Sequence, residues 1–276
     1  TDPYTENDTV RYSVSVNSRK YSTADYPHTE NFDTSSGFWV DIGGNATNEW
    51  VHGPLPAGYL GGPESQGDSW YIVKDGTSTY YDFILESPVF DLCQMTNPAI
   101  AFDLKFSLGN DWRDREIYFQ YSLDGGTSWT TIGSNADPNW TGLQPANGRS
   151  NAWGDGTIGS FTTMHNRLCL PSGEACVKLR LWCNDLRYND QVAFDNFRLY
   201  DQQGDDLEAV AIYPNEARTC ESYTMAEPLG IVVQNNTCRP LTNIPFTLNV
   251  TGPNSALFTD TIPGPIGRNG GRVQFE

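Results

Sequence analysis

The side chains that could carry out catalysis in this sequence do not fall into a recognisable catalytic pattern. The three histidines, His28, His52 and His165, stand in no H-E-x-x-H or triad-like context. The sequence also has no G-x-S-x-G elbow and no phosphate-binding loop. Paired carboxylates for glycoside hydrolysis stay open, because the sequence does not give their separation in space. We therefore expect a protein that is not an enzyme.

Carboxylates dominate the charge of the chain. The 276 residues hold 34 Asp and Glu against 17 Lys and Arg, which gives a formal net charge of −17. Such a surface repels phosphates and anionic membranes, so we expect no nucleic-acid partner. No stretch approaches the length of a membrane span, and the first 20 residues lack the apolar core of a signal peptide. Excess carboxylates have two ordinary uses, solubility and the binding of hard cations.

The cysteines indicate an oxidising compartment. None of the six belongs to a C-x-x-C pair, which argues against a zinc site or a thioredoxin-like motif. An even number of cysteines in an acidic, aromatic-rich chain is typical of extracellular proteins. Cys220 and Cys238 flank the first half of a small C-terminal unit, and we predict that they pair.

The other four cysteines are assigned less directly. Cys169 and Cys176 bracket a turn between two strands, and we predict a second disulfide between them. Cys93 and Cys183 either pair or stay as buried thiols, because connectivity does not follow from sequence.

The tryptophans are the best candidates for ligand contacts. Trp112, Trp140 and Trp153 lie in segments rich in Gly, Asn and Asp, and residues 134–160 read as a long polar loop. Long loops in compact domains are often functional, and exposed indoles stack on sugar rings, so a glycan or surface polysaccharide is the predicted ligand. In the alternative, these rings fold back over the edge of a sandwich and are buried.

Strands must position all of these residues. Residues 31–200 contain many short apolar or alternating runs bounded by Gly, Pro, Asn and Asp, which predicts an all-β sandwich or jelly roll. Residues 122–129 fit the pattern S-x-D-x-G-x-x-W, and their Asp-Gly-Gly predicts a hairpin turn. The mixed charges of residues 111–116 predict surface ion pairs.

The chain divides at a polar stretch. Residues 201–206, DQQGDD, precede four strand-like runs that predict a smaller, incomplete immunoglobulin-like sandwich. Residues 9–17 alternate as one isolated strand, which must complete some sheet. The predicted units are therefore residues 1–22, the end of a preceding immunoglobulin-like domain with its linker, then 23–203 and 204–276.

Residues 31–200 resemble a MAM-type jelly roll. The resemblance is carried by NFDTSSGFW at 31–39, GDSWYIV at 67–73, LESPVFDL at 85–92 and AFDNFRLYD at 193–201. The closing motif departs from the family's usual acidic pair, because it reads Asp195-Asn196, and the family's vertebrate cysteine framework is not reproduced. MAM domains are adhesion and recognition modules, so the resemblance implies binding and not catalysis.

Residues 206–276 resemble the bacterial immunoglobulin-like domain called CARDB. The strand-like runs DLEAV, EPLGIVVQN and NIPFTLNV carry this resemblance, and the phrase N-D-T-V of that family stands at Asn7 to Val10. A tandem array of such units implies a large surface adhesin of gliding bacteria, exported by type IX secretion. The secretion machinery and neighbouring domains of the same chain are then partners.

The jelly-roll resemblance also implies a structural calcium ion between the opening and closing strands. The matching positions are Asp33, Asp68 and Asp195. Three carboxylates from distant segments repel one another unless a cation neutralises them. In the alternative, Asp33 and Asp68 are turn residues and Asp195 belongs to a bulge.

Taken together, we expect a non-catalytic adhesion segment on the outer surface of a bacterial cell. The alternative is a carbohydrate-binding accessory module of a secreted hydrolase or protease. Asp8-Thr9-Val10 and Asp260-Thr261-Ile262 resemble a short bacterial O-glycosylation acceptor, which makes Thr9 and Thr261 candidate modified residues.

Overall fold

A computed structural model gives the fold. It describes residues 20–44, 47–61, 67–76, 79–109, 115–134, 140, 152–154, 156–170, 174, 176–187, 189–202, 204–213, 230–237, 239–252, 255–267 and 270–275. The described part consists of strands with two short 3-10 turns, η2 (Thr23–Asp25) and η3 (Tyr59–Gly61), and no α-helix. No helix in this part is long and apolar enough to cross a bilayer.

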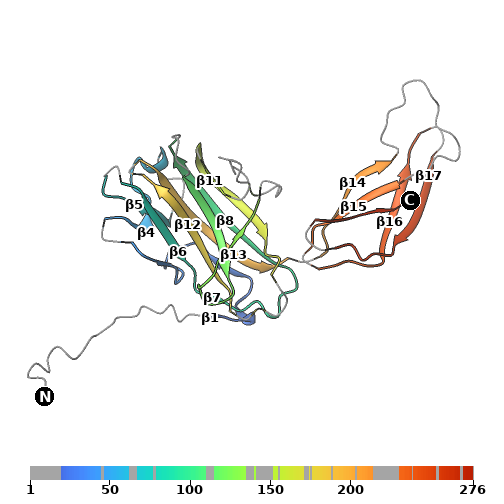
Figure 1. Cartoon of the computed structure of the whole chain (residues 1–276), viewed down its shortest axis with the longest axis horizontal. Coiled ribbons are helices and arrows are strands. Elements are labelled where there is room, and N and C mark those ends of the chain that lie inside the picture. Colours follow the sequence, from blue (N-terminus) through green and yellow to red (C-terminus); the bar gives the residue numbers. More distant parts are fainter. Residues whose placement is uncertain are drawn as a thin grey trace, which may run out of the picture.

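Two facing sheets form the larger sandwich (Figure 1). One sheet has the order β10-β9-β12-β6-β3, and the other has the order β11-β8-β13-β5-β4 with β2 paired to β13. The first sheet contains β10 (Thr130–Ile132), β9 (Glu116–Ser122), β12 (Lys178–Leu186), β6 (Tyr81–Glu86) and β3 (Val40–Asp41). The second contains β11 (Gly156–Arg167), β8 (Pro98–Leu108), β13 (Gln191–Asp201), β5 (Asp68–Val73), β4 (Glu49–Pro54) and β2 (His28–Glu30). A short parallel pair, β1 (Lys20–Tyr21) with β7 (Val89–Phe90), lies beside them.

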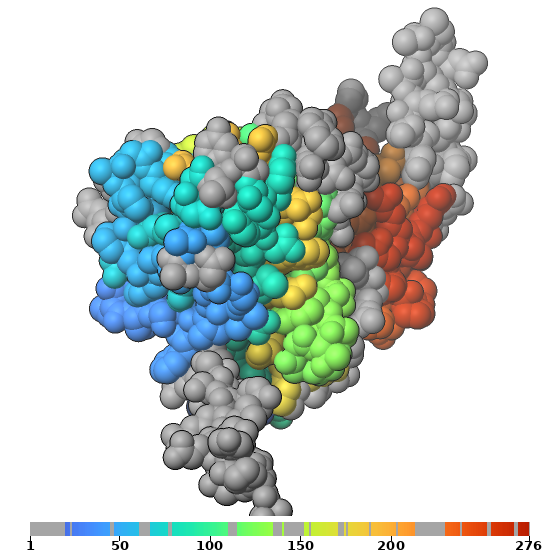
Figure 2. Space-filling model, turned by 60° about the vertical axis from the view of Figure 1, so that its left-hand side comes forward, coloured from blue at the N-terminus to red at the C-terminus, as the bar shows by residue number. Residues whose placement is uncertain are grey.

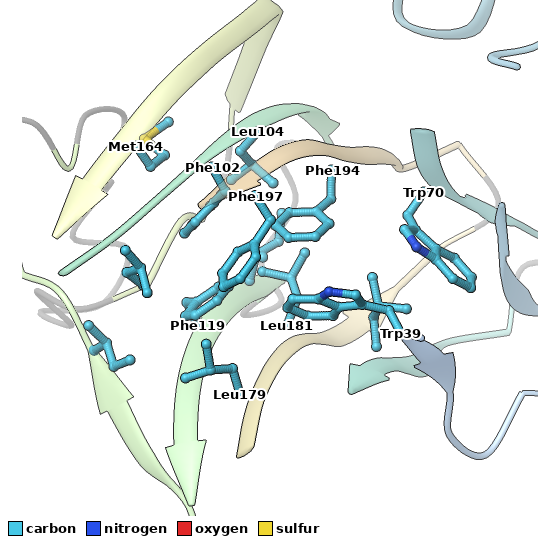
Figure 3. Close-up of a cluster of buried hydrophobic side chains, with 14 of the residues drawn as sticks. Trp39, Trp70, Phe102, Leu104, Phe119, Met164, Leu179, Leu181, Phe194 and Phe197 are labelled. Carbon is cyan, nitrogen blue, oxygen red and sulfur yellow. The ribbon is translucent and has the colours of Figure 1, made fainter. Parts of the chain in front are cut away.

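Alternation along the strands builds the core between these sheets. Phe102 of β8 and Phe119 of β9 stack across the sandwich with ring centroids 4.6 Å apart. Phe194, Phe197 and Trp39 join them, as Figure 3 shows, and all five side chains are buried. Burial of such rings dominates the stability of a sandwich because each removes a large apolar area from water.

Smaller sheets follow along the chain. Figure 1 shows these orange and red strands extending from one end of the larger sandwich. They are β14 (Leu207–Tyr213), β15 (Gly230–Asn235) and β18 (Gly271–Phe275) in one sheet, and β16 (Ile244–Val250) with β17 (Ala256–Ile262) in the other. A small cluster of Val233, Ile262 and Ile266 is buried between them. The predicted all-β architecture, a large sandwich followed by a smaller one, is confirmed.

The prediction of surface ion pairs for residues 111–116 is wrong where the structure describes them. Arg115 and Glu116 are buried, and residues 111–114 lie outside the described part. Arg115 Nη1 donates to Asp190 Oδ1 over 2.9 Å, and neither side chain is more than 1% exposed. Arg115 therefore serves the interior, because Asp190, directly before β13, pairs with its charge there.

Candidate functional site

Two of the predicted sugar-stacking tryptophans belong to the core. Trp140 is 2% exposed and Trp153 is 0% exposed. Their ring centroids lie 4.9 Å apart, and both rings pack against Phe102. They are therefore not a platform for a ligand, and the alternative of burial holds. The third candidate, Trp112, lies outside the described residues.

Among the described tryptophans, Trp129 and Trp182 are partly exposed. The sequence places Trp129 only in the hairpin motif and indicates no role for Trp182. They lie on the outer face of the five-stranded sheet with the Arg180 guanidinium between them, 4.2 Å from the Trp129 ring centroid and 5.4 Å from that of Trp182. Trp182 also stacks on Tyr118, with centroids 5.1 Å apart. Because these ring faces already contact protein groups, the row stabilises the sheet and offers little free surface for stacking.

The hairpin predicted at Asp124 forms as expected between β9 and β10. Asp124 Oδ1 accepts hydrogen bonds from the backbone N–H of Thr127 and of Ser128, at 3.0 and 2.8 Å. Trp129 Nε1 donates to the carbonyl of Gly126 over 3.0 Å. These local hydrogen bonds place Trp129 under the turn, so the motif has a structural role here.

The predicted calcium ligands are only partly brought together. Asp195 is buried at the β-bulge of β13, opposite Asp103 of β8, and interacts electrostatically with Asp33. The Asp33 carboxylate lies over Gly67, where a Cβ atom would meet its Oδ1 at 1.4 Å. Within the described residues, however, no group of three or more His, Cys, Asp or Glu side chains could hold a metal ion. The arrangement brings Asp195 near Asp33 and Asp103, and a calcium ion bound with Asp68 stays a prediction.

Burial raises the pKa of Asp195 to about 7, and the negative charges of Asp103 and Asp33 add to this effect. The folded protein then binds a proton that the unfolded chain has lost at pH 5 or 6. The stability that this proton contributes is complete below about pH 4 and is lost as the pH rises through about 7.

We expect Asp195→Asn to be more stable than the natural chain at pH 8, by about 2 kcal/mol after allowance for solvent screening. At pH 4 the difference should shrink to about 0.5 kcal/mol, because Asp195 is then protonated in the folded protein and about half protonated in the unfolded chain. A constant difference between pH 4 and pH 8 would contradict the buried carboxylate. Adding calcium to both proteins at pH 8 tests the predicted ion. Calcium should raise the free energy of unfolding of the natural chain and leave that of Asp195→Asn unchanged.

A groove of about 610 Å³ lies beside the sandwich. Its walls come from β10 and β11, which are the edge strands of the two sheets, and from the strands β14 and β15 of the smaller unit. Figure 2 shows the β9–β10 region, in light green, on the side of the sandwich toward the red strands. The side chains that line it include Thr130, Thr131, His165, Arg167, Glu208 and Gln234.

Arg167 fixes the position of the smaller unit at this groove. Its Nε donates to Gln202 Oε1 over 2.9 Å, and its Nη2 donates to Asp206 Oδ2 over 2.8 Å. Its Nη1 donates to the backbone carbonyl of Asn236, which follows β15. One guanidinium therefore joins the last residue of β11, the connecting segment and the smaller unit, and an arginine with its rigid fork of donors suits this task.

Hydroxyl and amide groups dominate the chemistry of the groove. Its wall carries Thr130, Thr131, Gln202 and Gln234 as hydrogen-bonding side chains, and Tyr121 supplies a partly exposed aromatic ring. The positive charge of Arg167 is paired with Asp206, while exposed Glu208 adds a negative charge. A ligand that fits this lining is neutral and rich in hydroxyl groups, since an anion would meet net negative charge.

The histidines have structural partners. His52 Nε2 lies 2.8 Å from the carbonyl oxygen of Phe32, and His165 Nε2 lies 2.5 Å from the hydroxyl of Tyr200. His28 is buried against Tyr21 and Phe90. The contacts of His52 and His165 are therefore with a backbone carbonyl and a tyrosine hydroxyl, and those of His28 are with aromatic rings.

The predicted pairing of Cys169 with Cys176 is wrong in this structure. Cys169 is in a disulfide, whereas Cys176 is a free, exposed thiol. Cys93 and Cys183 are also free thiols, and Cys183 is buried. Cys220 and Cys238 lie outside the described residues, so their predicted pairing is not addressed.

The two candidate glycosylation sites differ in what the structure describes. Thr261 is exposed on β17, where a glycan could be attached without disturbing the core. Thr9 lies outside the described residues. Modification of either residue stays a prediction.

Comparison with known proteins gives weak structural likenesses. No protein-family model matches the sequence, and no curated protein matches it. Among solved structures, the K1 cleaved adhesin domain of Lys-gingipain from Porphyromonas gingivalis W83 is 13% identical with a TM-score of 0.39, over 63% of this chain and 98% of that one.

Two carbohydrate-binding modules give similar values. The CBM22-1 xylan-binding domain from Paenibacillus barcinonensis Xyn10C is 9% identical with a TM-score of 0.38, over 64% of this chain and 94% of that one. TmCBM61, solved with β-1,4-galactotriose, is 12% identical with a TM-score of 0.40, over 63% of this chain and 99% of that one. At these values no ligand or residue role is transferred to this chain.

Proposed function

We propose that this chain is a non-catalytic binding segment of an extracellular protein, and that it binds a neutral glycan in the groove beside β10 and β11. The groove is the observation that carries the proposal, because its lining combines hydroxyls, amides and one aromatic ring. Sugar hydroxyls both donate and accept hydrogen bonds, so side-chain amides and hydroxyls match them well. Binding sites also occur preferentially where two units of a protein meet.

The disulfide at Cys169 supports an extracellular location. Disulfides persist in oxidising compartments and are rare in the cytosol. The net charge of −17 also fits a soluble segment that avoids anionic surfaces.

The finer proposal is that the segment belongs to a large surface adhesin of gliding bacteria that is exported by type IX secretion. It rests on the resemblance of residues 31–200 and 206–276 to modules that occur in such proteins. An accessory module of a secreted hydrolase would use the same groove, and the sequence of the full-length gene separates the two.

A glycan array tests the binding function. The folded chain should bind one or a few neutral oligosaccharides in preference to sialylated or sulfated ones, because Glu208 and the acidic surface disfavour anions. A heat-unfolded sample of the same chain is the control. Absence of binding to every neutral glycan, or equal binding by the unfolded sample, would contradict the proposal.

A further inference from the structure

The free cysteines Cys93 and Cys176 lie on neighbouring backbone segments. Phe90 at the end of β7 exchanges two hydrogen bonds with Val177, each 2.8 Å long. The segments run antiparallel, which places Asp91 opposite Cys176. The hydrogen bonding continues beyond this point with a one-residue shift in register, because the N–H of Leu92 donates to the carbonyl of Glu174 over 2.9 Å.

The side chains of Asp91, Cys93 and Cys176 point to the same side of this pair. Asp91 and Cys176 stand opposite one another, and Cys93 hydrogen-bonds the Asp91 carboxylate through its backbone N–H and its thiol. Cys93 is partly exposed and Cys176 is exposed, so both thiols can meet a reagent from solution.

Lys20 lies beside both thiols. Its ammonium pairs with Asp91 Oδ2 over 3.2 Å and interacts electrostatically with Cys93 and with Cys176. The backbone N–H of Cys93 donates to Asp91 Oδ1 over 3.1 Å. The Lys20–Asp91 ion pair is therefore the common neighbour of the two cysteines. The hydrogen bond to Asp91 raises the pKa of the Cys93 thiol, and the positive charge of Lys20 partly opposes this effect.

Cys183 differs from Cys93 and Cys176 because a reagent in solution cannot reach its thiol. It is 0% exposed, and burial raises the pKa of its thiol. A buried thiol in apolar surroundings is inert, so Cys183 cannot take part in exchange with a dissolved disulfide.

We propose that Cys93 and Cys176 form a disulfide in the oxidised protein, which fixes β7 to the segment before β12. A low-molecular-weight disulfide such as oxidised glutathione is the oxidant. One cysteine thiolate attacks it, forming a mixed disulfide and releasing one glutathione thiol. The second thiolate attacks the protein sulfur of the mixed disulfide and releases the other, so the two cysteines lose two protons and two electrons.

The bond requires only a local adjustment. Cys93 lies two residues beyond Asp91, which stands opposite Cys176, and Cα atoms of such diagonal neighbours lie about 7–8 Å apart. A disulfide needs about 7 Å or less, so the Cys93 backbone must move toward Cys176 for the bond to form. Cys93 stands at the start of a turn, where Met95 N–H donates to the carbonyl of Leu92, so its backbone can rotate without loss of the Phe90–Val177 hydrogen bonds.

Peptide mapping of the full chain tests the proposal. After equilibration with oxidised glutathione and alkylation of free thiols, trypsin and a Glu-specific protease should release residues 87–105 joined to residues 175–178. The second protease is needed because trypsin alone leaves Cys169 and Cys176 in one peptide. Recovery of both peptides separately, each with an alkylated cysteine, would overturn the proposal. Cys183 serves as an internal control, since it should be alkylated only after unfolding.

A thermal double-mutant cycle gives a second readout. Cys93→Ser and Cys176→Ser should each lower the melting temperature of the oxidised chain by about 10 °C, since the bond closes a long loop. The double variant should have the same melting temperature as each single variant, because all three lack the same disulfide. Additive shifts, or shifts that are equally large in reducing buffer, would show that the two side chains act independently.

Discussion

Asp190→Ala is expected to lower the free energy of unfolding by about 3–5 kcal/mol, which is the usual cost of breaking a buried ion pair. Asp190 Oδ1 accepts hydrogen bonds from Arg115 Nη1 and from the backbone N–H of Gly109, at 2.9 and 2.8 Å. Its Oδ2 accepts the N–H of Arg187 over 2.5 Å. Removal of this carboxylate leaves the Arg115 charge in an interior where its side chain is 1% exposed.

Urea unfolding at pH 7 measures this effect, and Asp205→Ala is the matched control. Asp205 pairs with Arg239 over 2.7 Å, but both side chains are at least 39% exposed. Exposed pairs contribute little, so the control should lose about 0.5 kcal/mol or less. Equal losses for the two variants would show that Arg115 and Asp190 are not shielded from water.

Trp153→Ala should cost about 3–5 kcal/mol, because it removes a fully buried indole and leaves a cavity. Trp153 packs on Trp140 and Phe102, and its backbone exchanges two hydrogen bonds with Ile117. This expectation separates its role in the core from the ligand platform predicted from sequence. A platform residue would lose binding while stability stays unchanged.

Trp182→Ala is the control for that experiment. Trp182 is partly exposed and stacks on Tyr118 and Arg180, so its loss should cost about 1 kcal/mol. Denaturant unfolding of both variants gives the two values. A Trp153 variant as stable as the Trp182 variant would contradict the packed core between the sheets.

Most strands of the larger sandwich could be predicted from alternation. The alternating runs expected within residues 31–200 include strands such as β8 and β9, because one face of each strand is apolar and buried. β11 was missed, since Gly, Ser and Thr fill much of residues 156–167 and the strand has a bulge between Ile158 and Thr162. An edge strand with two polar faces gives no periodic signal.

The site was harder to predict for a different reason. Gly and Asn around Trp140 and Trp153 indicated exposure, but the local composition of a loop does not reveal where its rings pack. Arg167 and Glu208 meet at the groove from separate units, and no local pattern links them. The predicted Cys169–Cys176 disulfide was wrong for a similar reason. Which cysteines lie side by side depends on the order of the strands in the sheets and not on the spacing of cysteines along the sequence.

Calorimetric titration of the best array ligand tests the central claim most directly. Thr130→Arg places a long cation into the groove, whereas Thr259→Arg makes the same change on exposed β17, away from it. We predict that Thr130→Arg weakens binding at least tenfold, a loss of about 1.4 kcal/mol, while Thr259→Arg binds as the natural chain does. Unchanged affinity in Thr130→Arg, with an intact melting temperature, would place the ligand elsewhere and contradict binding in the groove.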